Sequence, residues 1–441
     1  MFVALRSFKR IATLFSVAGL GLILATGATA QTQRQVYELS KADKDRISAV
    51  SGILLQAFEQ AKIYDPQYQA AQADFQSARI QATGNLFALA PSVRYSESVL
   101  EFESRSRKTL TITQPLFSIE KIGTFREADS RAAQAMANLK IKEYDLATRL
   151  VKATADYVKA NEILRTNQAR IETLQTEAGR AKKELELGQG TITDMRDTQV
   201  RLDQARATQL SLVAKLQTAA RTIQSITGSL PKENQWVLTR KPKTLKLGGL
   251  EEALTQAYAG NYQLMNAYSG LRLAELEQFK ARGAFAPEVN YQISKSQRGE
   301  TSTDSTGITI SFPLQAGGFF KVLSSSSGVE KAKATVRQVE QQVEVDVERF
   351  RTLTEAGLNE SNMRLQAISS AELSVLANEK SFAGGVRTRI DVLNSIQTQY
   401  QVIEDYVNSL MILSDNVLGL GTQTALPVDE IMAGLNNLLF E

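Results

Sequence analysis

The stretches ALAPSVRY (residues 88–95) and AFAPEVNY (residues 284–291) are similar in sequence and lie 196 residues apart. Pro91 and Pro287 hold matching places in them, although the chain has only eight prolines. Two further pairs of segments continue the likeness: TLTITQPLFS (109–118) with GITISFPLQA (307–316), and GQGTITD (188–194) with GVRTRID (385–391). Self-similarity over this length predicts that the chain folds as two copies of one structural unit.

Long helices are predicted in each half. Residues 116–230 and 314–426 contain no proline, so each stretch can form continuous helix. In the first stretch apolar residues recur at heptad spacing, interrupted by Glu143 and Asn167, which predicts a coiled-coil helix over about residues 122–187. The seam consists of Met136, Leu139, Leu146, Leu150, Ala153, Tyr157, Ala160, Leu164, Ile171, Leu174, Ala178, Ala181 and Leu185.

The second stretch repeats the heptad pattern, at Val329, Val336, Val343 and Phe350. Each long helix runs into a glycine-rich turn, LGQGT (187–191) in the first half and GGVRT (384–388) in the second. A glycine at a helix end followed by a short loop favours an antiparallel helical hairpin. We therefore expect returning helices over about residues 192–227 and 389–418.

Pairs of short strands are predicted before the long helices. Apolar and polar residues alternate at Val289, Tyr291 and Ile293, and again at Ile308 and Ile310. Segments of about ten residues with one apolar face suit the strands of a membrane barrel, although a small soluble β-layer has the same pattern. Four strands cannot close a barrel, since about eight is the smallest number that does, so a barrel would need several copies of the chain.

The first thirty residues have the order of a secretory signal peptide. Three basic residues in MFVALRSFKR precede an apolar run, and Ala28 and Ala30 fit a small-x-small cleavage site. The alternative is a membrane anchor, for which the apolar run is short. Later in the sequence no apolar run approaches the roughly 18 residues of a transmembrane helix.

Composition excludes several classes of function. The chain has no cysteine and no histidine, which excludes disulfides, a lipid-attachment cysteine, His/Cys metal sites and Ser-His or Cys-His catalysis. Its carboxylates lie on predicted helix faces, without a loop cluster to bring them together, so we expect neither an enzyme nor a cofactor. Without the three basic residues of the signal, 48 Lys and Arg balance 47 acids, which gives no electrostatic case for nucleic-acid binding.

At this point the sequence resembles the TolC type of outer-membrane efflux and secretion duct. The residues that carry the resemblance are the repeated APxVxY, the junctions QPLF (114–117) and FPLQAGG (312–318), and FAGGVRTRIDVLNSIQTQY (382–400). The resemblance implies a mainly α chain with β-structure that forms a homotrimer. Three copies would build a 12-stranded barrel in the outer membrane of a Gram-negative bacterium, above a long α-helical barrel in the periplasm.

The resemblance also implies a domain organisation after the signal peptide (1–30). Residues 31–228 would form the first repeat, with strands at about 88–117, and residues 250–422 the second, with strands at about 285–315. An equatorial region around the helical barrel would be formed by the segment 229–249 and the C-terminal tail 423–441.

In such ducts the helix tips close the periplasmic mouth. Matched to this sequence, Asp194 and Arg387 would form a charged link between neighbouring helix ends, with Thr193 as a nearby hydrogen-bonding partner. Asp391 would face the constriction, where three copies make a carboxylate ring that favours cations. From residue type alone, Thr191 and Asp194 are equally explained as ordinary helix caps.

Two gate positions depart from the family pattern. Phe382 stands where a tyrosine hydroxyl often joins the lock, and Asn394 stands where a second ring aspartate is often found. We therefore expect a missing link and a mouth that is less selective for cations. The tips that would dock an adaptor consist of Gly188, Gln189, Gly190 and Thr191 in one turn and Gly384, Gly385, Val386 and Thr388 in the other.

The resulting hypothesis is a passive exit duct that works with a periplasmic adaptor protein and an inner-membrane transporter, in contact with outer-membrane lipid. We expect type I protein secretion or general export with an ABC transporter, because a lipid-attachment cysteine is absent. Multidrug or small-molecule efflux with a proton-driven pump is the alternative. A soluble periplasmic coiled-coil adaptor fits less well, because it would lack the repeated strand pairs, and an exported hydrolase fits least.

Overall fold

The computed structural model describes residues 52–100, 103–232, 236–241, 243–283, 285–298, 300–312 and 316–440. They belong to Leu39–Glu441, one of two compact units of the chain, and the predicted signal peptide lies outside them. In chain order the elements are α3 (Ile53–Tyr64), α4 (Pro66–Leu86), β1 (Ser92–Leu100), β2 (Glu103–Phe117), α5 (Ile119–Glu186), α6 (Ile192–Thr227), α7 (Leu250–Gly260), α8 (Tyr262–Gly283), β3 (Glu288–Arg298), β4 (Thr301–Ser311), α9 (Ala316–Ala383), α10 (Arg389–Gln423) and α11 (Val428–Leu439).

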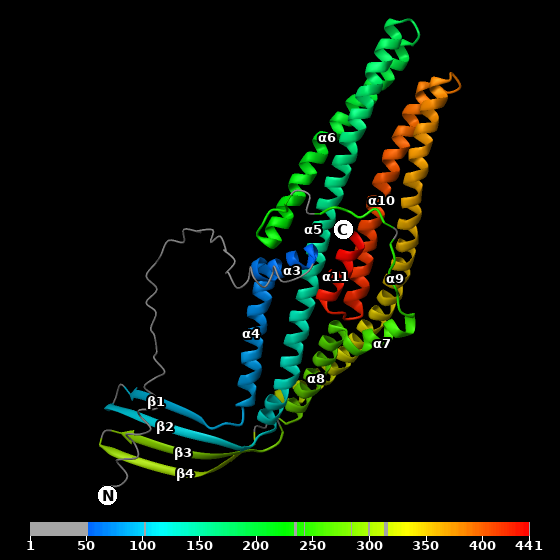
Figure 1. The fold of residues 1–441 in the computed structure, drawn as a ribbon. Helices are drawn as coiled ribbons and strands as arrows, with labels where there is room; N and C mark the ends of the chain where they lie inside the picture. The colour runs from blue at the N-terminus through cyan, green and yellow to red at the C-terminus, as the bar shows by residue number, and fades with distance from the viewer. Residues whose placement is uncertain are drawn as a thin grey trace. The chain divides into compact units, whose positions relative to one another are not determined.

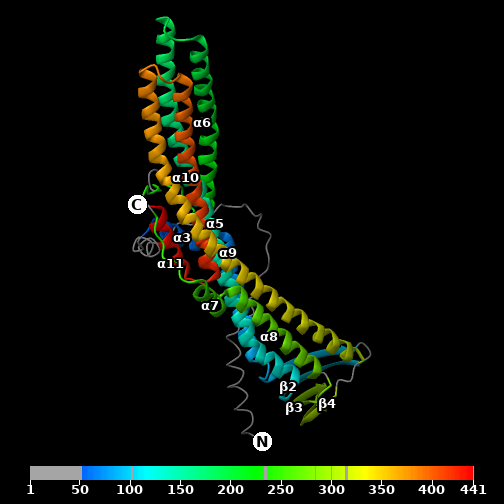
Figure 2. The same ribbon diagram turned by 90° about the vertical axis from the view of Figure 1, so that its right-hand side faces the viewer.

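Both halves of the chain use the same order of elements (Figure 1). Two short helices lead to a pair of strands, and a helix of 68 residues then turns back into a helix of 35 or 36 residues. The two long hairpins, α5–α6 and α9–α10, end in turns at the same end of this unit, as Figure 2 shows from the side. In the part of the chain that the structure describes, no helix has the length and apolar character needed to cross a membrane.

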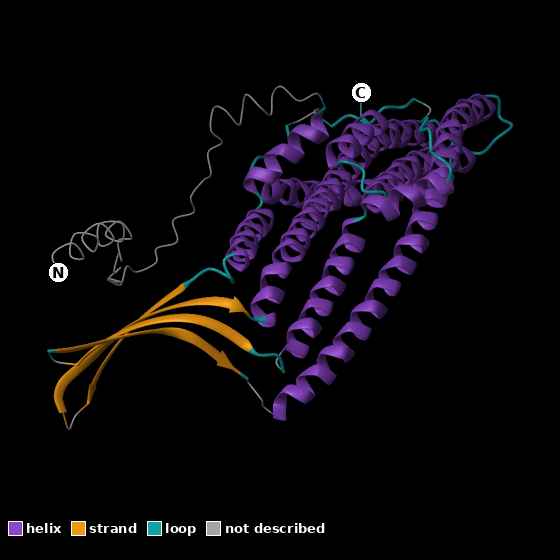
Figure 3. Ribbon diagram, turned by 90° about the horizontal axis from the view of Figure 1, so that it is seen from below, coloured by secondary structure: helices purple, strands orange, loops and turns teal. Residues whose placement is uncertain are grey.

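The four strands form one antiparallel sheet in the order β1-β2-β3-β4, which lies at the opposite end of the hairpins from their turns (Figures 1 and 3). The register places Val93 beside Ile112 and Ile112 beside Ile293, while in the next row Arg94 is beside Thr111 and Thr111 beside Ser294. Neighbouring rows point to opposite faces of a sheet. The face of Val93, Ile112 and Ile293 is therefore apolar nearer the helices, but toward the β3–β4 turn it carries the ion pairs Lys295–Asp304 and Lys108–Glu97.

The long helix α5 begins at Ser118, whose side chain accepts a hydrogen bond from the amide of Lys121. Most of the predicted seam is buried, but Met136 is 41% exposed, because α5 packs at this level through Ala135 and Ala137. Both predicted interruptions are satisfied by partners. The Asn167 side-chain amide donates to the Ala205 carbonyl at 2.9 Å, and the Glu143 carboxylate lies 2.6 Å from the Lys140 Nζ and 3.7 Å from the Lys62 Nζ.

The largest apolar core lies where α3, α5, α6, α10 and α11 meet, around Phe58, Leu150, Leu410 and Leu435. The segment between the two repeats joins this core. Its Trp236 ring packs edge-on against Phe440 with ring centroids 5.2 Å apart, and the Thr239 amide donates to the Leu439 carbonyl. The inter-repeat segment and the C-terminal tail are thus in contact beside the helices.

Each half has an elbow between its two short helices, at Asp65 in the first and Asn261 in the second. Asp65 caps α4 by accepting from the Tyr68 amide, and its two oxygens accept from Arg149 of α5 at 2.8 and 3.0 Å. Asn261 donates instead to the carbonyl oxygen of Gln423 at 2.9 Å. The first elbow is therefore held by an ion pair and the second by neutral hydrogen bonds.

Replacing Asp65 with alanine is expected to lower the free energy of unfolding by about 3 kcal/mol, because it removes a cap and leaves Arg149 unpaired. Burial alone raises the pKa of Asp65, but the hydrogen bonds from Arg149 and from the Tyr68 amide outweigh it, so the pKa lies below its usual range. The contribution is thus complete above about pH 4, the pKa of an unfolded aspartate, and is lost as the pH falls through the folded pKa.

Chemical unfolding of the purified chain at pH 7 and at pH 3 measures this difference. Asp145→Ala is the control, because Asp145 pairs with the same Arg149 at 3.3 Å but its side chain is 48% exposed. An equal loss of stability in both variants would contradict the role of Asp65 as the partner that stabilises the elbow.

Candidate gate at the helix tips

The turns at the two hairpin tips have the same geometry. Gly188 and Gly385 have φ of 71° and 75°, a left-handed conformation that favours glycine. In the first turn the Glu184 carbonyl accepts hydrogen bonds from the amides of residues 189 and 190, and in the second the Ser381 carbonyl accepts from residues 386 and 387. The repeated sequence therefore produces two matching helix ends.

The helices that leave the turns are capped in the same way. The amide of Asp194 donates to the Thr191 hydroxyl at 3.1 Å, and that hydroxyl donates to the Asp194 carboxylate at 2.6 Å. In the second turn a carboxylate oxygen of Asp391 accepts from the Thr388 amide at 2.9 Å and from the Thr388 hydroxyl at 2.8 Å. This is the reciprocal arrangement of a capping box.

These hydrogen bonds also set the charge state of Asp391. The hydrogen bond from the Thr388 amide, then that from its hydroxyl, holds the pKa of Asp391 below its ordinary value, and Arg387 adds to the effect. The Asp391 carboxylate is therefore charged at neutral pH while it caps the helix.

The remaining predicted gate residues are placed differently from one another. Thr193 and Arg387 are exposed beside the caps, and so are Gln189, Gly384 and Val386. Within the ranges that the structure covers, Asp194 and Arg387 form no ion pair inside one chain. The link between them stays a prediction for neighbouring helix ends.

Asn394 and Phe382 have specific partners. The side-chain oxygen of Asn394 accepts from Arg201 of α6 at 2.8 Å, so this residue joins α10 to the other hairpin. The ring of Phe382 lies under the guanidinium of Arg389, 4.8 Å from its carbon to the ring centroid. Phe382 has no hydroxyl to form the missing link, but its ring packs against the Arg389 guanidinium.

That cation, Arg389, was not among the sequence-predicted residues. It is 4% exposed, and it donates at 2.7 Å to Glu177 of α5. It also donates to Glu184, about two turns further along the same helix. A charged residue next to a capping threonine is usually exposed, and both partners lie more than 200 positions away in the sequence. A buried arginine with two carboxylates could not be anticipated from the local pattern.

Further polar contacts join α10 to α5 behind Arg389. Arg170 donates to the side-chain oxygen of Gln397, and the hydroxyls of Thr173 and Tyr400 lie 3.3 Å apart. One apolar side chain, Leu393, is inserted among the core residues of α5 and α6 at this level. The contact between the two hairpins near the tips is thus largely polar.

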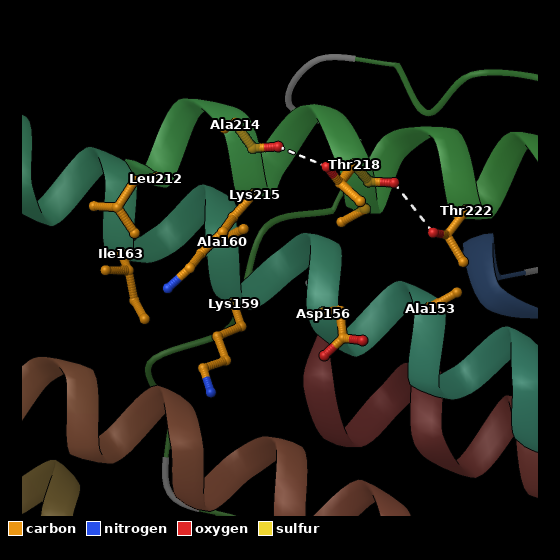
Figure 4. Close-up of a pocket in the computed structure, with 11 residues that line it drawn as sticks. Ala153, Asp156, Lys159, Ala160, Ile163, Leu212, Ala214, Lys215, Thr218 and Thr222 are labelled. Atoms are coloured by element: carbon orange, nitrogen blue, oxygen red, sulfur yellow. Dashed lines mark hydrogen bonds between the residues drawn. The ribbon is translucent and has the colours of Figure 1, made fainter. Parts of the chain in front are cut away.

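A groove of about 540 Å³ lies farther from the tips, between α5 and α6. Small side chains, including Ala153, Ala160 and Ala214, line it, and Figure 4 shows Asp156 and Lys159 directed from α5 toward the ribbon of α10. The groove follows from the separation of two helices over small residues, and none of the predicted gate residues lines it. In the described ranges no group of three or more His, Cys, Asp or Glu side chains is placed to hold a metal ion.

Sequence comparison shows that the chain is similar to outer-membrane and secretion proteins. No family model matches the chain. The alkaline protease secretion protein AprF of Pseudomonas aeruginosa is 25% identical over 393 residues, which cover 80% of each protein. The outer membrane protein TolC of Escherichia coli is 21% identical over 425 residues, which cover 88% of this chain and 85% of TolC. The chain is similar to outer-membrane proteins of the TolC type over most of its length.

Solved structures agree with a TolC-type fold. The outer membrane protein VceC of Vibrio cholerae superposes with a TM-score of 0.70 at 17% identity, covering 84% of this chain and 95% of VceC. The outer-membrane channel OprN gives a TM-score of 0.72 at 15% identity, covering 88% and 92%. The mainly α fold with a small antiparallel sheet, predicted from the repeats, is confirmed.

Replacing Thr388 with alanine is expected to open the first turn of α10, because it removes the hydroxyl that accepts from the Asp391 amide and donates to the Asp391 carboxylate, while the amide of residue 388 keeps its bond to that carboxylate. A cap of this kind corresponds to about a fivefold change in local opening. Amide hydrogen exchange of a peptide that spans the turn measures it. Thr398→Ala is the control, since the Thr398 hydroxyl bonds to a carbonyl within the same helix; equal exchange in both variants would argue against the cap.

Proposed function

We propose that three copies of the chain form a passive exit duct, with a barrel of twelve strands in the outer membrane and a helical barrel in the periplasm. The observation that carries the proposal is the two-faced sheet. Its rows alternate between apolar residues such as Val93, Ile112 and Ile293 and polar residues such as Thr111 and Ser294. An apolar outside and a polar inside are what a water-filled membrane barrel requires.

The two edges of the sheet support the involvement of several copies. β1 and β4 are its outer strands, and in the described part of one chain each pairs on one side only. Lipid does not tolerate an open edge, because each unpaired backbone group there costs several kcal/mol. Pairing β1 of one copy with β4 of the next closes the sheet, and three copies give twelve strands.

The helical hairpins also have faces that suit another copy. Leu210 on α6 is 77% exposed, and Met363 and Leu373 on α9 are 70% and 68% exposed. α6 and α9 belong to different hairpins of the chain (Figure 2). When hairpins continue side by side around a ring, these two faces meet between neighbouring copies.

An aromatic belt marks one edge of the proposed membrane region. Exposed phenylalanines stand at all four junctions between strands and helices: Phe87, Phe117, Phe285 and Phe312, with Phe319 and Phe320 at the start of α9. Aromatic girdles flank the apolar band of outer-membrane barrels. Strands of 9 to 15 residues above this belt are long enough to span the apolar layer.

The partners proposed are a periplasmic adaptor at the hairpin tips and an inner-membrane ABC transporter of a type I secretion system. AprF and the proteases secretion protein PrtF of Dickeya chrysanthemi, which is 23% identical over 389 residues, are both named for protein secretion. The alternative is small-molecule efflux with a proton-driven pump, which is supported by the outer membrane efflux protein BepC of Brucella suis at 21% identity over 284 residues.

Cross-linking from the tips tests the proposal. Val386 is 80% exposed in the second turn, and the chain has no cysteine, so Val386→Cys supplies a single thiol. In intact cells, a short bifunctional reagent is expected to capture an adaptor, identified by mass spectrometry. The transporter encoded or purified with that adaptor then distinguishes protein secretion from efflux.

Ser302→Cys is the matched control, because Ser302 lies in β4 close to the turn that joins it to β3, far from the helix tips. Capture of the adaptor by both variants, or by neither, would contradict docking at the tips. In mild detergent the purified chain is expected to have the protein mass of three copies, and a monomer would refute the shared barrel.

The proposed gate makes a prediction of its own at Asp391. Asp391→Asn keeps an oxygen that can cap α10 but removes the charge from each copy, so the permeability ratio of potassium to chloride is expected to fall. Reversal potentials in planar bilayers measure this ratio. Asp203→Asn, at an exposed carboxylate on α6, is the control, and an unchanged ratio in Asp391→Asn would remove Asp391 from the constriction.

A further inference from the structure

Arg389 lies where three helices meet near the tips. Its guanidinium bonds to Glu177 and Glu184 of α5 and stacks on Phe382 of α9, while the residue itself begins α10. The side chains of Arg389 and Glu177 are 3% and 6% exposed. A buried charge without a partner is strongly unfavourable, so this contact forces the end of the second hairpin to stay in one position against the first.

The contact is present at one of two equivalent places in the repeat. In the register that matches Thr191 with Thr388, Arg389 corresponds to Ile192, Glu184 to Ser381 and Glu177 to Ser374. Ile192 is 60% exposed, and Ser374 is exposed as well. The two hairpin tips have the same turns and caps, but only the second has the charged contact. The shared helix geometry therefore does not by itself produce this contact.

The other contacts of α10 divide by direction. Toward α9, inside its own hairpin, it presents Val392, Ile396 and Tyr400 to Val375 and Phe382 in an apolar cluster. Toward the first hairpin, the contacts near the tip are the polar ones of Arg389, Asn394 and Gln397, with Leu393 as the apolar exception. Polar contacts depend on geometry more than apolar ones do, so their number here specifies one relative position of the hairpins.

We propose that Arg389 is a positioning residue that fastens the two hairpin tips of each chain into one rigid body. Its pairing with Glu177 and Glu184 is the principal contact, and Asn394 and Gln397 extend it along α10. The inference rests on the proposed function in that the tips then form the mouth of the duct, but the fastening itself is a property of a single chain.

The distance between the two tips of one chain tests the fastening. Gln189 and Val386 are exposed in the first and second turn, so spin labels at Gln189→Cys and Val386→Cys report this distance by pulsed electron paramagnetic resonance. Co-expression with an excess of the unlabelled full chain keeps labelled copies apart. We expect one narrow distance distribution, which broadens and shifts to longer distances in Arg389→Gln.

Arg180→Gln is the matched control. Arg180 also bonds to Glu177, at 2.7 Å, but it belongs to α5 and its side chain is 60% exposed. This variant also removes a positively charged partner of Glu177, but it leaves the contact between the hairpins unchanged. Its distance distribution is expected to match that of the unmodified chain. A broad distribution in the unmodified chain, or the same narrow one in Arg389→Gln, would overturn the proposal.

Glu184→Gln keeps the test available if Arg389→Gln does not fold. Glu184 is the less buried partner, with a side chain 33% exposed, and a smaller broadening is expected from it. Single-channel conductance distinguishes a failure of the duct from a failure of the fastening. Absence of conductance in every form, with the distances as expected, would refute the duct and leave the fastening intact, whereas normal conductance with unaltered distances would refute the fastening alone.

Discussion

The structure depends on the requirement that every backbone hydrogen-bonding group in the sheet finds a partner. In the described part of one chain β1 and β4 each pair on one side only, and the exposed apolar side chains of Val93, Tyr95, Ile308 and Ile310 make water an unsuitable surrounding for the sheet. Closing the edges inside a membrane needs further copies of the chain. The arrangement of the helices follows, because each strand pair is joined directly to α5 or α9 and would thereby place one long hairpin below the proposed barrel.

Duplication gives the chain two similar units that have since acquired different contacts. The elbows before α4 and α8 stand at equivalent positions, yet one is held by the Asp65–Arg149 ion pair and the other by Asn261 and Gln423. At the tips the capping threonines are retained in both halves, while Arg389 has a partner set that Ile192 lacks. Backbone geometry is thus shared, and the side chains that bind one half to the other are not.

Sequence patterns predicted those parts of the fold that local rules determine. The limits of α6, predicted at about residues 192–227, were confirmed because a threonine cap and a left-handed glycine define its ends. Heptad spacing located α5, but it misplaced Met136, since spacing does not reveal where the packing partner changes. Arg389 was missed for a related reason. Its role comes from carboxylates more than 200 positions away, and a repeat pattern describes what the halves share, not what joins them.

The unequal contacts at the tips have a consequence for the symmetry of a closed ring. In the proposed trimer three chains would contribute six hairpins, and six equivalent hairpins would move apart equally at all six boundaries. Arg389 joins α10 to α5 inside each chain, while the equivalent position on α6 is the exposed Ile192, so this buried contact would occur only at the boundaries within a chain. If the proposed fastening holds, such a ring would move as three pairs of hairpins, and its widening would be concentrated at the three boundaries between neighbouring chains.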